Sequence, residues 1–156
     1  MNKRQNKYFE GDLFLVPVYN SEPVVGLIAR LSKDKMLGYF FKHNITKGAE
    51  FSDVKKIILK ENILLIHMCS LLGFTKGEWK LFGKMDYFKN FDFEIPTFKR
   101  VDVLSGECFE VLYNNNLEEV NCIKVSDCET LDGFPEDGLA GYQFIQKRLS
   151  RILSLM

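Results

Sequence analysis

The chain has 156 residues, which is a common length for a single folded domain. Hydrophobic residues make up 46% and charged residues 27%, a composition that excludes an intrinsically disordered chain. The formal net charge is zero, from 21 basic and 21 acidic residues, so the chain lacks the excess of positive charge that general nucleic-acid binding requires.

Residues 1–10 form a polar, basic tail, and residues 11–156 are expected to form one domain. No apolar segment follows the tail, so we expect no secretory signal. The longest apolar run, Ile63 to Leu72, is interrupted by polar residues and is too short to cross a bilayer. These features predict a cytoplasmic protein without a membrane partner.

Apolar segments separated by turn residues predict a series of short antiparallel strands. In chain order the expected strands are Asp12 to Tyr19, Val24 to Leu31, Met36 to Phe41, Asn62 to Ser70, Glu78 to Gly83, Phe98 to Val103, Cys108 to Tyr113 and Leu117 to Val125. The fourth is apolar on both faces, which is typical of a central strand. Phe51 to Leu59 fits either a helix or a strand. Met85 to Pro96 is aromatic and has no regular period, so we expect it to pack over the core as a lid.

The C-terminal segment changes to a helical period, in which apolar residues recur at spacings of three and four. The residues of this stripe are Tyr142, Ile145, Leu149, Ile152 and Met156. Residues 135–137, a proline and two acids, suit the first turn of the helix. We therefore predict an α+β fold: a mostly antiparallel twisted sheet or small open barrel of about seven to eight strands, with this amphipathic helix packed on it.

The search for catalytic motifs finds no phosphate-binding glycine loop, no GxSxG and no HExxH. His67 and Cys69 lie on one face of an expected strand, where a thiolate–imidazole pair or half a metal site is conceivable. Core packing is the better interpretation, because a catalytic cysteine needs an exposed, electropositive pocket. We predict no catalytic residues, no metal site and no cofactor.

The four cysteines, Cys69, Cys108, Cys122 and Cys128, show no paired motif spacing. Thiols in a reducing compartment stay free. We therefore predict that none of the four forms a disulfide or binds metal.

Charge is segregated along the sequence. Residues 101–137 contain ten carboxylates and one lysine, a net charge of −9, and the other residues carry +9. These carboxylates either pair with lysines brought in by the fold or form an acidic surface that docks a basic partner. Our hypothesis for the docking surface is a set of seven residues: Glu118, Glu119, Asp127, Glu129, Asp132, Glu136 and Asp137.

Short motifs follow one another along nearly the whole chain: Gly11-Asp12-Leu13-Phe14 with Pro17, Val25-Gly26-Leu27-Ile28, Gly77-Glu78-Trp79-Lys80-Leu81-Phe82-Gly83, Pro96-Thr97-Phe98 with Asp102, and Gly141-Tyr142 with Arg148-Leu149. Each motif is weak alone, but in this order they resemble the immunity protein 26 family, cytosolic protectors from bacterial polymorphic-toxin loci. The resemblance implies a protein that binds and neutralises a cognate toxin. It does not identify the toxin.

Structural roles explain several of these motif residues. Gly11 and Gly83 suit turns or close approach of the backbone, and Trp79 suits an anchor for the aromatic lid.

Two other functions fit the residues less well. Short strands can close into a barrel, and a lysine-rich N-terminal portion would suit a nucleic-acid-binding or antitoxin-like module. The absence of interleaved exposed aromatic residues argues against nucleic acid as a partner. A small hydrolase that uses His67 and Cys69 is the third alternative.

Overall fold

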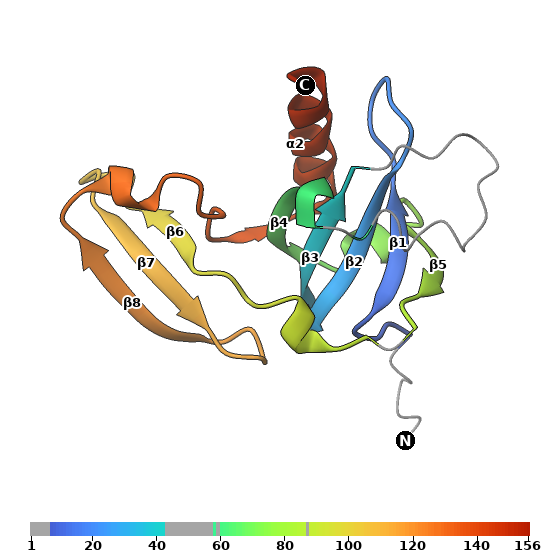
Figure 1. Cartoon of the computed structure of the whole chain (residues 1–156), viewed down its shortest axis with the longest axis horizontal. Coiled ribbons are helices and arrows are strands. Elements are labelled where there is room, and N and C mark those ends of the chain that lie inside the picture. Colours follow the sequence, from blue (N-terminus) through green and yellow to red (C-terminus); the bar gives the residue numbers. More distant parts are fainter. Residues whose placement is uncertain (1–6, 43–57, 59, 87) are drawn as a thin grey trace.

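The computed structural model describes residues 7–42, 58, 60–86 and 88–156 (Figure 1). Its strands are β1 (Asp12–Val16), β2 (Val24–Leu31), β3 (Lys35–Phe41), β4 (Ile63–Ser70), β5 (Lys80–Lys84), β6 (Phe98–Val101), β7 (Cys108–Tyr113), β8 (Glu119–Val125) and β9 (Leu139–Ala140). Its helices are α1 (Leu72–Thr75) and α2 (Tyr142–Ser154), with the 3-10 helices η2 (Lys60–Asn62), η3 (Asn90–Asp92) and η4 (Cys128–Leu131). In the described residues no helix is long and apolar enough to span a membrane.

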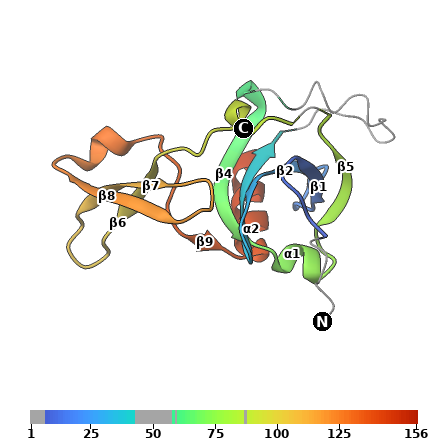
Figure 2. The ribbon, with the colours of Figure 1, turned by 90° about the horizontal axis from the view of Figure 1, so that it is seen from below.

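The strands form two sheets. The large sheet has the order β5-β1-β2-β3-β4-β9, in which β9 runs parallel to β4 and the other pairs are antiparallel. The small sheet has the order β6-β7-β8 and extends to one side of the large sheet (Figures 1 and 2). The prediction of an α+β fold with a C-terminal helix is therefore confirmed.

Two details of that prediction are wrong. Within the described part of the chain the strands divide into two sheets rather than one sheet or open barrel, and they number nine rather than seven or eight. The additional strand, β9, has two residues, which is too short for a periodic signal in the sequence. The segment 51–59, expected as helix or strand, lies outside the described residues apart from Ile58.

Both faces of the large sheet are covered, so β2 and β3 are buried along nearly their whole length. On one face Phe14, Phe40 and Cys69 pack beneath α1 and α2. On the other face Leu27 and Tyr39 pack with residues of the small sheet and of the lid. The large sheet is therefore a middle layer, which explains why β2 and β3 are apolar on both sides. The expectation that the fourth strand is central is wrong, because β4 lies near the edge with only the two-residue β9 beyond it.

Helix α2 buries the centre of the predicted stripe. Ile145 and Leu149 are fully buried, Tyr142 and Ile152 are half-buried, and Met156 is exposed. The helix begins at Tyr142, after the N-cap Gly141, so the prediction that residues 135–137 form its first turn is wrong. Those residues run beside β6 instead and exchange backbone hydrogen bonds with Lys99.

Trp79 anchors the helix layer rather than the lid, which corrects the sequence-based expectation. Its ring stacks on Phe14 at a centroid distance of 5.3 Å, and its Nε1 donates a hydrogen bond to Gln146 of α2. A Cβ added at Gly73 would lie 2.6 Å from the indole ring, so only glycine lets α1 pack this closely. Gly11 has a φ of +92°, as expected for a glycine that permits a turn.

The aromatic lid packs on the opposite face of the large sheet. Phe88 and Phe93 contact the core there, whereas Phe91 is exposed. The hydroxyl of Tyr39 donates a hydrogen bond to the carbonyl oxygen of Glu94. The lid prediction is confirmed for these residues, and Tyr87 lies outside the described residues.

Arg30 ties the lid and the small sheet to β2. A register shift between Ile28 and Arg30 leaves an extra residue in β2, so Arg30 faces the lid side together with its pairing partner Leu37. The buried guanidinium donates hydrogen bonds to the carbonyl oxygens of Ala29, Asn90 and Phe93, and to the side chain of Asn115, at 2.7–3.0 Å. One side chain therefore holds three separate segments together.

The Leu149→Ala variant tests the packing of α2. We expect the free energy of unfolding to fall by about 2–5 kcal/mol, because truncation leaves a cavity between the helix and the sheet. Urea unfolding followed by fluorescence of the buried Trp79 measures the change. Leu155→Ala is the matched control, since Leu155 is 78% exposed on the same segment. Equal stability of the two variants would contradict the packing.

Candidate partner-binding surface

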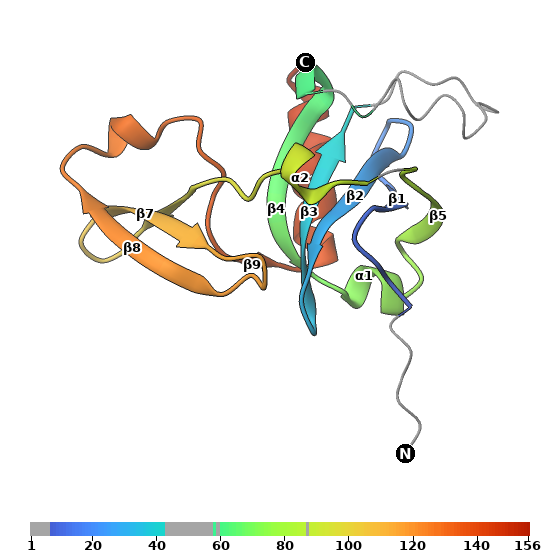
Figure 3. The same cartoon turned by 60° about the horizontal axis from the view of Figure 1, so that its bottom comes forward.

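The acidic segment of the sequence is also one region in space. Residues 101–137 contain β7, β8, η4 and most of the connection to β9, and they build most of the small sheet beside the large one (Figure 3). The third strand, β6, precedes them and carries Lys99 and Arg100. The charge segregation seen in the sequence is therefore a segregation between two parts of the structure. The seven hypothesised docking residues do not all have the same role within it.

Asp137 and Glu119 bind an arginine of the small sheet. The carboxylate of Asp137 is almost fully buried and accepts hydrogen bonds from Arg100, at 2.8 Å, and from the hydroxyl of Tyr113. Glu119 accepts a second hydrogen bond from Arg100. These two acids join β6, β7 and β8 to the chain that leads to β9, so they hold the small sheet together.

This arrangement raises the pKa of both residues that donate hydrogen bonds to Asp137. Hydrogen bonds to Glu119 and Asp137 raise the pKa of Arg100 above its ordinary value. Burial, followed by the hydrogen bond to Asp137, raises the pKa of Tyr113. Arg100 and Tyr113 were not predicted to be important, because only the register of β6 and β7 shows that they share a face.

Glu136 and Asp132 contact cations more loosely. Glu136 lies 3.4 Å from Arg148 of α2, and Asp132 lies 3.9 Å from Lys99 with 75% of its side chain exposed. Exposed pairs of this kind contribute about 0–1 kcal/mol, and salt screens them. Asp132 therefore remains available to a partner.

Glu118, Asp127 and Glu129 are exposed, and among the described residues no cationic side chain lies within ion-pair distance of them. Asp127 caps η4 by accepting a hydrogen bond from the backbone of Glu129. Glu118 precedes β8 and η4 follows it, so these residues lie at opposite ends of the small sheet. The structure thus brings together Asp127, Glu129 and Asp132, which we name the η4 carboxylates.

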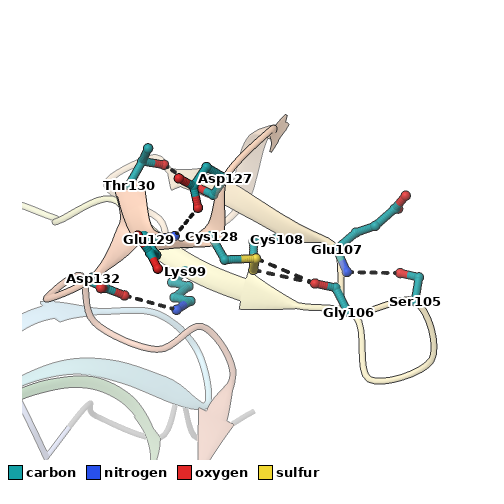
Figure 4. The surroundings of a disulfide bond; sticks show 10 residues. All are labelled: Lys99, Ser105, Gly106, Glu107, Cys108, Asp127, Cys128, Glu129, Thr130 and Asp132. Atoms are coloured by element: carbon teal, nitrogen blue, oxygen red, sulfur yellow. Dashed lines mark hydrogen bonds and ion pairs between the residues drawn. A yellow bond between two sulfur atoms is a disulfide. The ribbon is translucent and has the colours of Figure 1, made fainter.

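A disulfide bond fixes this group. Cys108 at the start of β7 and Cys128 in η4 are bonded, with their Cα atoms 5.4 Å apart (Figure 4). The prediction that no cysteine forms a disulfide is wrong. The two residues are 20 positions apart without a motif, and only the β7–β8 pairing brings the end of β8 back beside Cys108. Leu131 of η4 is fully buried, which further anchors the short helix.

His67 and Cys69 pack in the core, which confirms the interpretation favoured from the sequence. Cys69 is fully buried, and burial raises the pKa of its thiol, so the reactive thiolate is disfavoured. The imidazole of His67 hydrogen-bonds the carbonyl oxygen of Met68 and lies against Phe144. The described residues include no group of three or more side chains that could hold a metal ion.

Comparison with known proteins adds no relative. The chain matches no protein-family model, no curated protein and no solved structure. The resemblance to the immunity protein 26 family therefore rests on the short motifs alone.

A thiol count tests the disulfide. The structure places two free thiols in the chain, the exposed Cys122 and the buried Cys69. We expect a thiol reagent to label one cysteine in the folded protein, two after unfolding and all four after unfolding and reduction. Cys122→Ser should abolish the labelling of the folded protein. Labelling of four thiols in the unfolded, unreduced protein would show that Cys108 and Cys128 are not bonded.

The raised pKa of Tyr113 predicts a loss of stability at alkaline pH. Below about pH 10, the ordinary tyrosine pKa, the phenol is protonated in both the folded and the unfolded chain. In this range Tyr113 makes its full contribution to the free energy of unfolding. At higher pH the unfolded chain releases this proton while the folded chain retains it, so the free energy of unfolding falls. The difference in unfolding free energy between wild type and Tyr113→Phe should therefore shrink above about pH 10.

The control for this experiment is Phe109→Leu. Phe109 is half-buried on the same face of β7 and does not titrate, so its substitution should destabilise the protein by an amount that does not change with pH. Urea unfolding across this pH range compares the two variants. If the difference in unfolding free energy between wild type and Tyr113→Phe did not change with pH, the raised pKa of Tyr113 would be contradicted.

Proposed function

We propose that the protein is an immunity protein that binds a cognate bacterial toxin and neutralises it. The η4 carboxylates are the observation that carries this proposal. Three acidic side chains are exposed at one short helix, Glu129 within it and Asp127 and Asp132 at its two ends, and a disulfide and a buried leucine hold that helix against the small sheet. Such a fixed group of charges is suited to recognising a basic protein.

The acidic charge suits a toxin that acts on nucleic acid. A toxin that cleaves nucleic acid needs a basic groove that attracts phosphate groups. An acidic inhibitor can occupy this groove, since the same electrostatic field draws it in and speeds association. Because η4 is already ordered, less conformational entropy is lost on docking. The short motifs that resemble the immunity protein 26 family support the same function.

The proposed location is the cytoplasm, where a protector of the producing cell would meet the toxin. Disulfides persist mainly in oxidising compartments, whereas the cytoplasm keeps most thiols reduced. The Cys108–Cys128 bond would then be open in part of the population, which would loosen η4. Binding is therefore to be measured on both the oxidised and the reduced protein.

Neutralising two of the η4 carboxylates tests the function. We expect the Glu129→Gln, Asp132→Asn double variant to associate with the toxin about three- to tenfold more slowly at low ionic strength, with a smaller difference at high salt. The protein encoded immediately upstream in the genome is the toxin candidate to be tested. Association rates at two ionic strengths measure the effect, and circular dichroism checks the fold. Glu136 and Asp137 are left unchanged because both bind arginines.

The matched control is Glu22→Gln with Glu61→Gln. It removes the same charge from exposed positions outside the small sheet. Association that slows equally in the two double variants would show only a general effect of net charge. Unchanged association in the η4 variant would remove this surface as the docking site.

A further inference from the structure

The outer strands are β5 and β9 in the large sheet and β6 and β8 in the small sheet. β6 has an isolated bridge from Lys99 to Glu136, and β9 has only two residues. β4 is paired with β9 only at Met68 and Cys69, so residues 63–67 have no described strand on their outer side. In a strand of this kind alternate residues turn their N–H and C=O groups outward, where an added strand can bind them.

The β4 edge differs from the outer strands β5, β6 and β8 in its side chains. Lys80 and Lys84 lie in β5, Lys99 and Arg100 in β6, and Glu119 and Lys124 in β8. Charged residues at an edge discourage the pairing of foreign strands. Residues 63–66 are Ile-Leu-Leu-Ile, without a charge, and all four are half-buried. This edge therefore lacks the charges that oppose strand addition.

A groove of about 460 Å³ lies along the β4 edge. Residues 63–67 line one side, residues 133–136 line the other, and Arg148 and Ile152 of α2 complete it. In Figure 2 β9 and β4 are the strands of the large sheet on the side of the small sheet, and β9 is the nearer of the two. Phe134 is 40% exposed beside it, and the Glu136–Arg148 ion pair adds one polar position.

We propose that this groove binds an extended peptide segment of a partner protein, which adds to β4 as a further strand. The backbone of an extended segment can form hydrogen bonds with the outward N–H and C=O groups of alternate β4 residues. β9 already pairs with the same edge at Met68 and Cys69, so the bound segment continues a pairing that the chain itself begins. Apolar side chains of β4, Phe134 and Ile152 line the groove together with the polar Glu136 and Arg148, so it suits a segment in which apolar and polar side chains alternate.

This inference goes beyond the proposed inhibition of a toxin. The groove shares residues 133–136 with the acidic segment but none of the η4 carboxylates. Loss of binding at one surface is therefore distinguishable from loss at the other. The η4 double variant should bind peptides in the groove as wild type does.

Peptide selection supplies the probe. A phage-displayed library of random dodecamers is selected on the folded, full-length protein, and one enriched peptide is synthesised. We expect enriched sequences with alternating apolar residues, and slower hydrogen exchange at outward amides of residues 63–67 when the peptide is bound. Methylating the peptide backbone nitrogen should weaken binding about tenfold at alternate positions and little at the positions between them.

Matched phenylalanine variants locate the site. Phe134→Ala should weaken peptide binding about tenfold, as expected for an aromatic residue at a binding site. Phe91→Ala removes an exposed phenylalanine from the lid and should leave binding unchanged. Protection of amides outside β4, or an equal loss for every methylated position, would overturn the proposal. A dimer of the free protein that protects the same amides would assign the edge to a second copy and would also overturn it.

Discussion

The buried guanidinium of Arg30 fixes how the parts of this protein are placed. A buried cation is tolerated only when its donors are hydrogen-bonded, and here the acceptors come from the lid and from the turn between β7 and β8. The lid and the small sheet are thus both fixed to β2. Because η4 is bonded to the small sheet through Cys128, the orientation of the candidate docking surface also depends on Arg30.

Periodicity in the sequence predicted where the strands and the helix lie. It did not predict which elements pack against each other. Alternating apolar residues located the strands, and the spacing of Ile145 and Leu149 located the helix. The position of Trp79 was misassigned because alternation separates two faces of a strand without showing which layer covers each face. Arg30 gave no signal, since its direction depends on a bulge that local propensities do not reveal.

The sequence predicted that the candidate site is acidic. It did not predict which of its carboxylates are paired with other side chains. Glu129 and Asp137 look alike in the sequence, yet one is exposed and the other is buried against Arg100 and Tyr113. That difference arises from the register of β6 and β7, which brings distant residues onto one face. The disulfide escaped prediction for a related reason, because Cys108 and Cys128 meet only after β8 has turned back along β7.

Strands β1 to β4 are neighbours both in the sequence and in the large sheet, whereas β5 and β9 join its edges from later in the chain. Local pairings have the smaller entropic barrier, so this meander can assemble first. During synthesis the N-terminal strands emerge long before α2. Phe74 of α1 and Trp79 can cover Phe14 before then, but the remainder of this apolar face stays uncovered until α2 leaves the ribosome, so it is a surface of the nascent chain that a chaperone can shield.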